Sequence, residues 1–171
     1  MKIAKPNVED YPPFFGTYID KISSDDLLIT LEQNGASFHK FIEGLSEEKM
    51  NYRYAPDKWT VKEMLLHITD TERIMCYRAL RFARKDSTHL SSFEENDFAA
   101  NSFGAQRSTA SLLSEFDVVR KATLELFKNF DESVLDFKGT ANNKMISVRA
   151  LGYTIAGHEM HHLSVINERY L

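Results

Sequence analysis

The sequence predicts an all-α protein, a four-helix bundle built as one domain over residues 1–171. Four segments of about twenty residues repeat apolar side chains every three to four positions, the period of an amphipathic helix. Only 7 Gly and 4 Pro occur in the chain, which disfavours a turn-rich sandwich or barrel. The 43% of apolar and 27% of charged residues are typical of a globular domain, and 171 residues suffice for one core but hardly for two.

Residues 1–22 precede the first helix. Pro6, Pro12 and Pro13 interrupt any helical period there, so the sequence predicts an extended strap anchored by aromatic side chains. The first helix is expected to begin near Ser24. Its apolar side chains recur at helical spacing: Leu28, Leu31, Phe38, Ile42 and Leu45.

The second helix has the clearest start signal. Thr60 is a candidate N-cap and Glu63 its partner in a capping box, with the helix running to about Arg84. The polar connection over 85–107 is long: about 23 extended residues reach roughly 75 Å, whereas a helix of 25 residues is roughly 37 Å long. The chain can therefore return along the bundle, which makes the second and third helices parallel and the topology up-down-down-up.

The third helix is predicted over 109–130. Residues 131–146 are expected to form a loop, and Asn142-Asn143 could form the turn of a small hairpin within it. Ser147 can cap the fourth helix, which continues nearly to Leu171.

Charge and cysteine content restrict the partners and the compartment. The 25 acidic and 21 basic residues give a formal charge of −4, which does not indicate nucleic-acid binding. No stretch reaches the roughly 18 uncharged apolar residues of a membrane span, and the first residues do not resemble a signal peptide. Cys76 is the single cysteine, as suits a reducing compartment. We expect a cytoplasmic protein with neither nucleic acid nor membrane as a partner.

The most informative segment lies on the last helix, where His158 and His162 are four residues apart. At about 100° per residue, the two imidazoles lie about 40° apart on one helix face. They interrupt an apolar stripe that contains Leu151 and Ile155. Two histidines at this spacing commonly offer two nitrogens to one metal ion.

The second helix carries a matching histidine, His67, on a stripe with Met64, Thr71 and Ile74. Three inward imidazoles from two helices predict a site for one divalent metal ion with a position left open. Zinc, nickel, copper and iron all accept neutral imidazole, so the ligands do not identify the metal. The alternative is that the three rings are hydrogen-bonded core residues, which is costly without a common partner.

Asp70, Glu159 and His161 flank these stripes. Each could orient a ligand by a hydrogen bond, and Asp70 could also act as a general base. The alternatives are a surface charge for Asp70, a solvated carboxylate for Glu159 and a boundary position for His161. His39 and His89 are expected to be structural or exposed.

Three further side chains have weaker signals. Cys76 lies about 180° from His67 on the same helix, so we expect a buried or interface thiol and not a nucleophile at the histidines. Arg78 and Arg169 end the two stripes. Either arginine could bind an anionic group of a substrate, or form a cap or a surface ion pair.

The segment 158–162 also matches H-E-x-x-H, the helix motif of zinc metallopeptidases. Those enzymes usually take a third ligand downstream and need a strand beside the cleft. Only nine residues follow His162, with Glu168 as the one candidate, and no such strand is predicted. A peptidase is therefore disfavoured.

The chain resembles the DinB-like superfamily, in the branch of YfiT-like metal-dependent hydrolases and bacillithiol transferases. The resemblance is carried in order by five segments: 11–13, 59–72, 93–97, 158–163 and 167–170. It implies an up-down-down-up bundle and one divalent ion, often nickel or zinc, held by three histidines. These correspond here to His67, His158 and His162.

The resemblance also implies an activity. We expect a metal-dependent enzyme, foremost an S-transferase that uses a small thiol against electrophilic small molecules. The alternatives are a hydrolase that activates water and a non-enzymatic, stress-related metal-binding protein. A homodimer is a further expectation, because such bundles can pair through exposed apolar helix faces.

Overall fold

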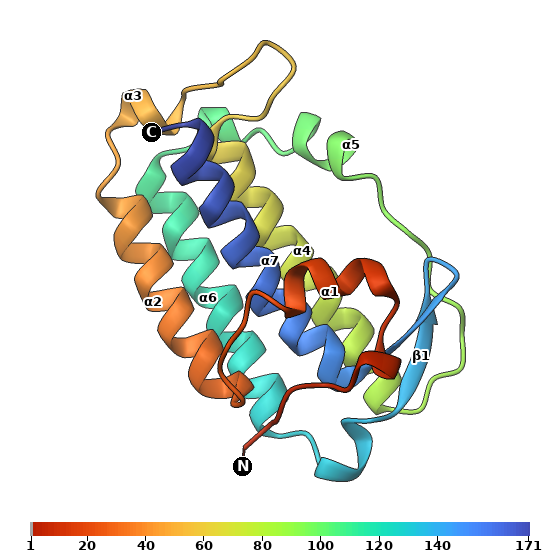
Figure 1. Ribbon diagram of the computed structural model, residues 1–171. Helices are drawn as coiled ribbons and strands as arrows, with labels where there is room; N and C mark the ends of the chain where they lie inside the picture. Colours follow the sequence, from red (N-terminus) through yellow and green to blue (C-terminus); the bar gives the residue numbers. More distant parts are fainter. Residues whose placement is uncertain (1) are drawn as a thin grey trace.

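The computed structural model describes residues 2–171 and forms a bundle of four long helices (Figure 1). None of the helices in this range is long and apolar enough to cross a membrane. The α-helices, in chain order, are α1 (Pro13–Ile19), α2 (Leu27–Glu43), α3 (Glu47–Met50), α4 (Val61–Ala83), α5 (Glu95–Ala100), α6 (Thr109–Lys128) and α7 (Val148–Arg169). The strands are β1 (Lys138–Ala141) and β2 (Lys144–Ser147), and three single 3-10 turns lie at Val8–Asp10, Gly104–Gln106 and Glu132–Val134.

The topology of the bundle is up-down-down-up. Figure 1 shows α2 and α7 running toward one end of the molecule, and α4 and α6 running toward the other. Helix α4 packs against α6 and α7, and α2 packs against the same two helices from the far side. The long connection after α4 carries the chain back along the bundle before α6 begins, and it includes the short helix α5. The predicted parallel arrangement of α4 and α6 is confirmed.

Local capping fixes the starts of the long helices. Thr60 Oγ1 accepts from the backbone N–H of Glu63 at 3.1 Å, and the Glu63 carboxylate accepts from that of Thr60 at 2.7 Å. This is the predicted capping box of α4. Ser147 caps α7 by accepting from Ala150 N–H at 3.1 Å. Helix α2 begins later than expected, because Asp26, and not Ser24, caps its first turn.

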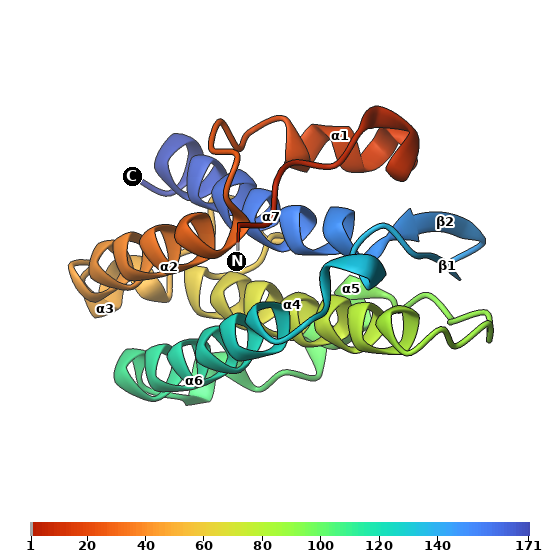
Figure 2. The ribbon, with the colours of Figure 1, turned by 90° about the horizontal axis from the view of Figure 1, so that it is seen from below.

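The prediction that residues 1–22 form an extended strap was wrong for Pro13–Ile19, which form helix α1; residue 1 lies outside the described residues. Pro12 and Pro13 begin helix α1 instead of preventing it, because Pro13 occupies the first helical position, where a missing N–H costs no hydrogen bond. Figures 1 and 2 show α1 lying against α7, outside the four long helices. The N-terminal segment thus covers one side of α7.

The predicted hairpin is present. Strands β1 and β2 pair antiparallel, and the two residues between them, Asn142 and Asn143, have φ of 49° and 56°. Positive φ at both turn positions suits a tight hairpin and is tolerated best by Gly and Asn. Leu90 pairs with the edge of β1 and ties the connection after α4 to the hairpin.

The core consists of two apolar clusters, one toward each end of the bundle. One is centred on residues such as Phe82, Phe127 and Tyr153, and the other on residues such as Phe38 and Phe116. Buried polar side chains of α4, α6 and α7 lie between the clusters. They include His158 of the candidate site, next to which His67 and His162 are half-buried.

Candidate metal centre

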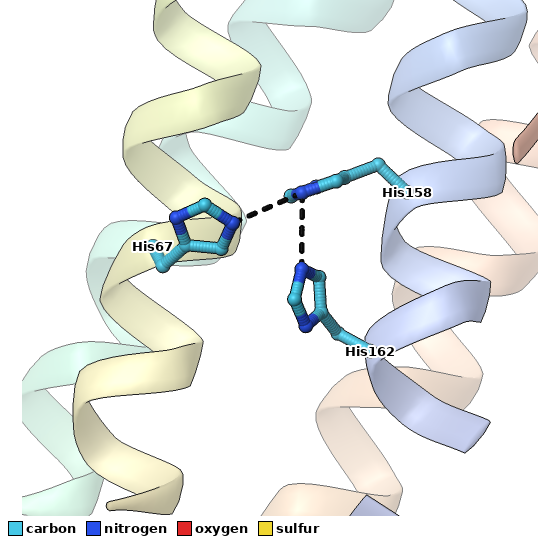
Figure 3. A group of neighbouring side chains, drawn as sticks. All are labelled: His67, His158 and His162. Carbon is cyan, nitrogen blue, oxygen red and sulfur yellow. Dashed lines mark hydrogen bonds between the residues drawn. The ribbon is translucent and has the colours of Figure 1, made fainter. Parts of the chain in front are cut away.

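Three imidazoles converge between α4 and α7 (Figure 3). The Nε2 atom of His158 lies 3.0 Å from Nε2 of His67 and 3.1 Å from Nε2 of His162. Helical spacing on α7 places His158 and His162 one turn apart, and the packing of α4 on α7 brings His67 to face them. The structure therefore brings together the three histidines that the sequence singled out.

Burial keeps these rings neutral. Removal from water, reinforced by the charge of His161, lowers the pKa of His67 to about 4. Burial and the neighbouring imidazoles lower the pKa values of His158 and His162 well below their ordinary value. Neutral imidazoles have the nitrogen lone pairs that a metal ion requires.

The arrangement fits a divalent metal ion. A neutral imidazole has one N–H donor and one acceptor nitrogen, so Nε2 of His158 cannot donate to both of its neighbours. Two nitrogens on one ion at about 2.0–2.1 Å are at most about 4.2 Å apart, which accommodates the contacts of 3.0 and 3.1 Å. A shared cation would give the three facing nitrogens a common partner.

The three rings lie in the wall of a pocket of about 330 Å³. Aromatic side chains from α1, from the segment before α4 and from the long connection form much of its lining: Phe14, Phe15, Tyr18, Trp59 and Phe93. The ring centroids of Trp59 and His67 are 4.7 Å apart, and those of Tyr18 and His158 are 5.3 Å apart. The pocket can therefore hold a small molecule with an apolar body.

Helix α1 reaches this pocket because α7 has a glycine at Gly157. A Cβ atom at that position would lie 2.2 Å from the carbonyl oxygen of Tyr18. Only glycine permits this approach, which places the Tyr18 ring against His158 and His161.

The other sequence candidates lie in different surroundings. His161 lines the pocket, half-buried beside Tyr18 and His162. Asp70 is paired with Arg73 at 3.0 Å and is not part of the pocket. Cys76 faces α6, with its sulfur 3.2 Å from Thr123 Oγ1, and burial raises the pKa of its thiol to about 12.

The two arginine candidates and the two outlying histidines differ in whether they lie at the pocket. Arg78 is buried in the pocket wall, whereas Arg169 is exposed at the end of α7. His39 is paired with Asp117 at 3.0 Å, and His89 is exposed in the connection. Both outlying histidines match the sequence expectation.

The expectation that Glu159 is solvated was wrong. Its side chain is fully buried and pairs with Arg120 of α6. The error has a physical cause: α1, α2 and α4 all pack against α7, so a residue well away from the histidine stripe is still inside the protein. A helix buried on most sides has no solvated face to predict.

The sequence reasoning missed the buried ion network around Arg120. The guanidinium donates to both carboxylate oxygens of Glu72, at 2.9 and 2.8 Å, and to the carbonyl of Leu31 at 2.8 Å. The sequence does contain a signal for a buried carboxylate: Glu72 lies seven residues after Leu65 and so shares its buried stripe on α4. The aromatic wall from α1 was missed because it depends on tertiary contacts.

The sequence profile of the DinB superfamily matches residues 30–166. The chain belongs to the DinB superfamily. This match covers α4 and most of α7, and hence the three histidines. A search of curated proteins found no match.

A solved structure supports the same DinB fold. YfiT from Bacillus subtilis has a TM-score of 0.70 to this chain at 14% sequence identity, covering 88% of this chain and 86% of YfiT. That structure is described as "a probable metal-dependent hydrolase with an unusual four-helix bundle topology". At this identity the likeness establishes the shared fold.

Proposed function

We propose that this protein is a divalent-metal-dependent enzyme that acts on small molecules, with His67, His158 and His162 as the metal ligands. The observation that carries the proposal is the convergence of three neutral imidazole nitrogens in the wall of an aromatic pocket. Zinc and nickel are the preferred ions, since both accept imidazole. When bound, such an ion would act as a Lewis acid that lowers the pKa of a coordinated thiol or water.

We propose an S-transferase that uses a small external thiol as the leading activity. A free thiol ionises at a pKa of about 8.5, so it needs little assistance from a protein base. The one carboxylate among the described residues that line the pocket, Glu95, is exposed at its edge. Cys76 cannot supply the nucleophile, because it faces α6 on the opposite side of α4 from His67. Aromatic side chains of the pocket would hold the apolar part of the electrophile.

A hydrolase is the second candidate, favoured by the description of YfiT as a probable metal-dependent hydrolase. In that case His67, His158 and His162 keep the same role, and the pocket excludes bulk water from the scissile group. The cytoplasmic location and the homodimer stay predictions from the sequence.

The test begins with metal content and continues with turnover. Full-length protein loaded with zinc or nickel is assayed with a chromogenic electrophile and, in turn, glutathione, cysteine, coenzyme A and bacillithiol. Hydrolysis of 4-nitrophenyl acetate is measured without thiol. Thiol conjugation supports the transferase, and hydrolysis alone replaces it by the hydrolase.

Two variants connect the activity to the site. His67→Ala combined with His158→Ala should abolish stoichiometric metal binding in elemental analysis, along with any turnover. His39→Ala is the matched control and should retain both. Full metal occupancy in the double variant would overturn the proposed ligands.

A further inference from the structure

Arg78 is a buried cation with no carboxylate partner among the residues that the structure describes. Its side chain is 6% exposed, although it lies in the wall of the histidine pocket. Nη2 donates to the carbonyl oxygen of Ser91 at 2.9 Å, and Nη1 lies 3.9 Å from the sulfur of Met75. Burial lowers its pKa, and no opposing charge among the described residues compensates for this. A buried charge without an ionic partner is costly, because neutral acceptors replace only part of its hydration.

Arg120 is a buried arginine that does have carboxylate partners, and it serves as a comparison for Arg78. Arg120 is buried to the same degree, at 5% exposure, and is held by the carboxylates of Glu72 and Glu159. Arg78 uses two of the five N–H donors of a guanidinium on neutral groups. The remaining donors match the two oxygens of a carboxylate, which arginine commonly binds in a bidentate manner.

A second unsatisfied group lies between Arg78 and the histidines. Thr71 is 4% exposed, lines the same pocket, and its hydroxyl has no hydrogen-bond partner among residues 2–171. It follows His67 by four residues and precedes Arg78 by seven, so all three share one face of α4. An unpaired buried hydroxyl is uncommon and indicates an absent partner.

From these observations we propose that the pocket binds a small molecule carrying a carboxylate, which forms an ion pair with Arg78. The hydroxyl of Thr71 would form a hydrogen bond with the same ligand at a point closer to the histidines. This inference rests on the proposed function in one respect: it places the reacting end of the ligand at the three imidazoles. At this end of the pocket the ligand meets one positively charged side chain, Arg78, since the described lining contains no other Arg or Lys. A single positive charge suits a monoanion better than a doubly charged phosphate.

The spacing on α4 sets the length of the ligand. Arg78 lies eleven residues beyond His67, about 16 Å along the helix axis at about 1.5 Å per residue. The contact with Met75 places the guanidinium about one turn nearer to His67. The carboxylate and the reacting end should therefore be separated by on the order of 10 Å. The aromatic side chains between them suit an apolar linker or ring.

The competing explanation gives Arg78 a purely structural role, because its bond to Ser91 fastens the connection after α4. Arg78 also borders a neighbouring hollow lined by Tyr77, His89 and Phe98, where an anion could bind without reaching Thr71. A structural role predicts a lower melting temperature when Arg78 is replaced. Binding in the neighbouring hollow predicts that replacing Thr71 leaves anion binding unchanged, whereas the proposal predicts weaker binding.

The test measures binding to chelator-treated full-length protein, so that a carboxylate cannot coordinate the metal. The probe is 4-phenylbutyrate, with neutral 4-phenylbutanamide as its matched analogue, and the signal is the fluorescence of Trp59, the chain's single tryptophan and a pocket residue. The carboxylate should bind about tenfold or more tightly than the amide, as expected for a charge-assisted pair. Equal affinities would overturn the proposal.

Three variants locate the binding group, after circular dichroism has verified their folding. Arg78→Met should abolish the preference for the carboxylate, whereas Arg73→Met, on the exposed side of the same helix, should keep it. Thr71→Val should weaken carboxylate binding several-fold with unchanged or raised melting temperature, because it removes an unpaired buried hydroxyl. Unchanged binding in Thr71→Val would assign the anion to the neighbouring hollow and refute the proposal.

Two results separate this inference from the proposed function. A lower melting temperature in Arg78→Met, with the carboxylate preference intact, would make Arg78 structural and overturn the inference while leaving the metal centre untouched. Carboxylate binding that depends on Arg78 in a protein that takes up no metal would support the inference and refute the proposed function.

Discussion

Replacing Arg120 by Met tests whether the buried ion network joins the helices beside the metal centre. Arg120 extends from α6, and its partners are Glu72 on α4, Glu159 on α7 and the carbonyl of Leu31 on α2. One side chain therefore links all four long helices. Methionine is long, unbranched and apolar, so it fills much of the same space and removes chiefly the charge and the hydrogen bonds.

The expected loss is large. Removing one partner of a buried ion pair costs about 3–5 kcal/mol, because the remaining charge stays buried without compensation. At about 2–4 °C per kcal/mol for a chain of this size, the melting temperature should fall by about 6–20 °C. Urea unfolding followed by circular dichroism measures the free energy directly. Arg73→Met is the control: Arg73 is exposed and pairs with Asp70 and Glu115 at the surface, so its loss should cost less than about 1 kcal/mol.

The pH dependence distinguishes lost charge from lost packing. Burial raises the pKa of Glu159 and Arg120 opposes the rise, so the Met variant should raise it further. A carboxyl whose folded pKa lies above its unfolded value binds its proton more tightly in the folded chain. Its destabilising effect is therefore largest at high pH and declines as pH falls through the folded pKa. The loss in free energy of unfolding of Arg120→Met relative to wild type should therefore become smaller as the pH is lowered from neutral into the acidic range. A deficit equal to that of Arg73→Met, or one independent of pH, would refute the reasoning.

Three further predictions concern the site and its surroundings. Because the pKa of His67 is lowered to about 4 in the folded chain, metal-free protein should be most stable above about pH 6.5 and lose stability as pH falls toward about 4. Urea unfolding should show a smaller loss in metal-free His67→Gln, and an equal loss would contradict the shift. Cys76→Ser should keep turnover within about twofold, since its thiol faces away from the site; a folded, metal-loaded variant without activity would contradict this placement. Gly157→Ala should cost about 1–3 kcal/mol in thermal unfolding, because the new Cβ meets the Tyr18 carbonyl. Gly16→Ala, where the nearest atom would be 3.5 Å away, should change little, and equal melting temperatures for the two variants would argue against the close approach.

The starts of α4 and α7 and the pairing of His158 with His162 could be predicted because they depend on neighbouring residues. A capping box involves residues three positions apart, and two histidines four apart share a face in any α-helix. The parallel course of α4 and α6 followed from the length of the connection between them. The inward orientation of His67 could be predicted because the helical periodicity of α4 puts it on the same stripe as apolar residues.

Helix α1 was not predicted because two prolines admit either a break or a helix start, and only its docking on Gly157 decides between them. Glu159 was misplaced for a related reason. Periodicity identifies an exposed face only when a helix has one, and α7 is covered by α1, α2 and α4.

The sequence by itself thus determined the fold class, the helix starts set by caps and the histidines that meet between α4 and α7. The tertiary structure decided which charges have partners: Arg120 with two carboxylates, and Arg78 with none among residues 2–171. The physical reason is the range of the interactions. Helical period and capping act within a few residues, whereas the partner of a buried charge comes from another helix and is fixed only when the helices pack.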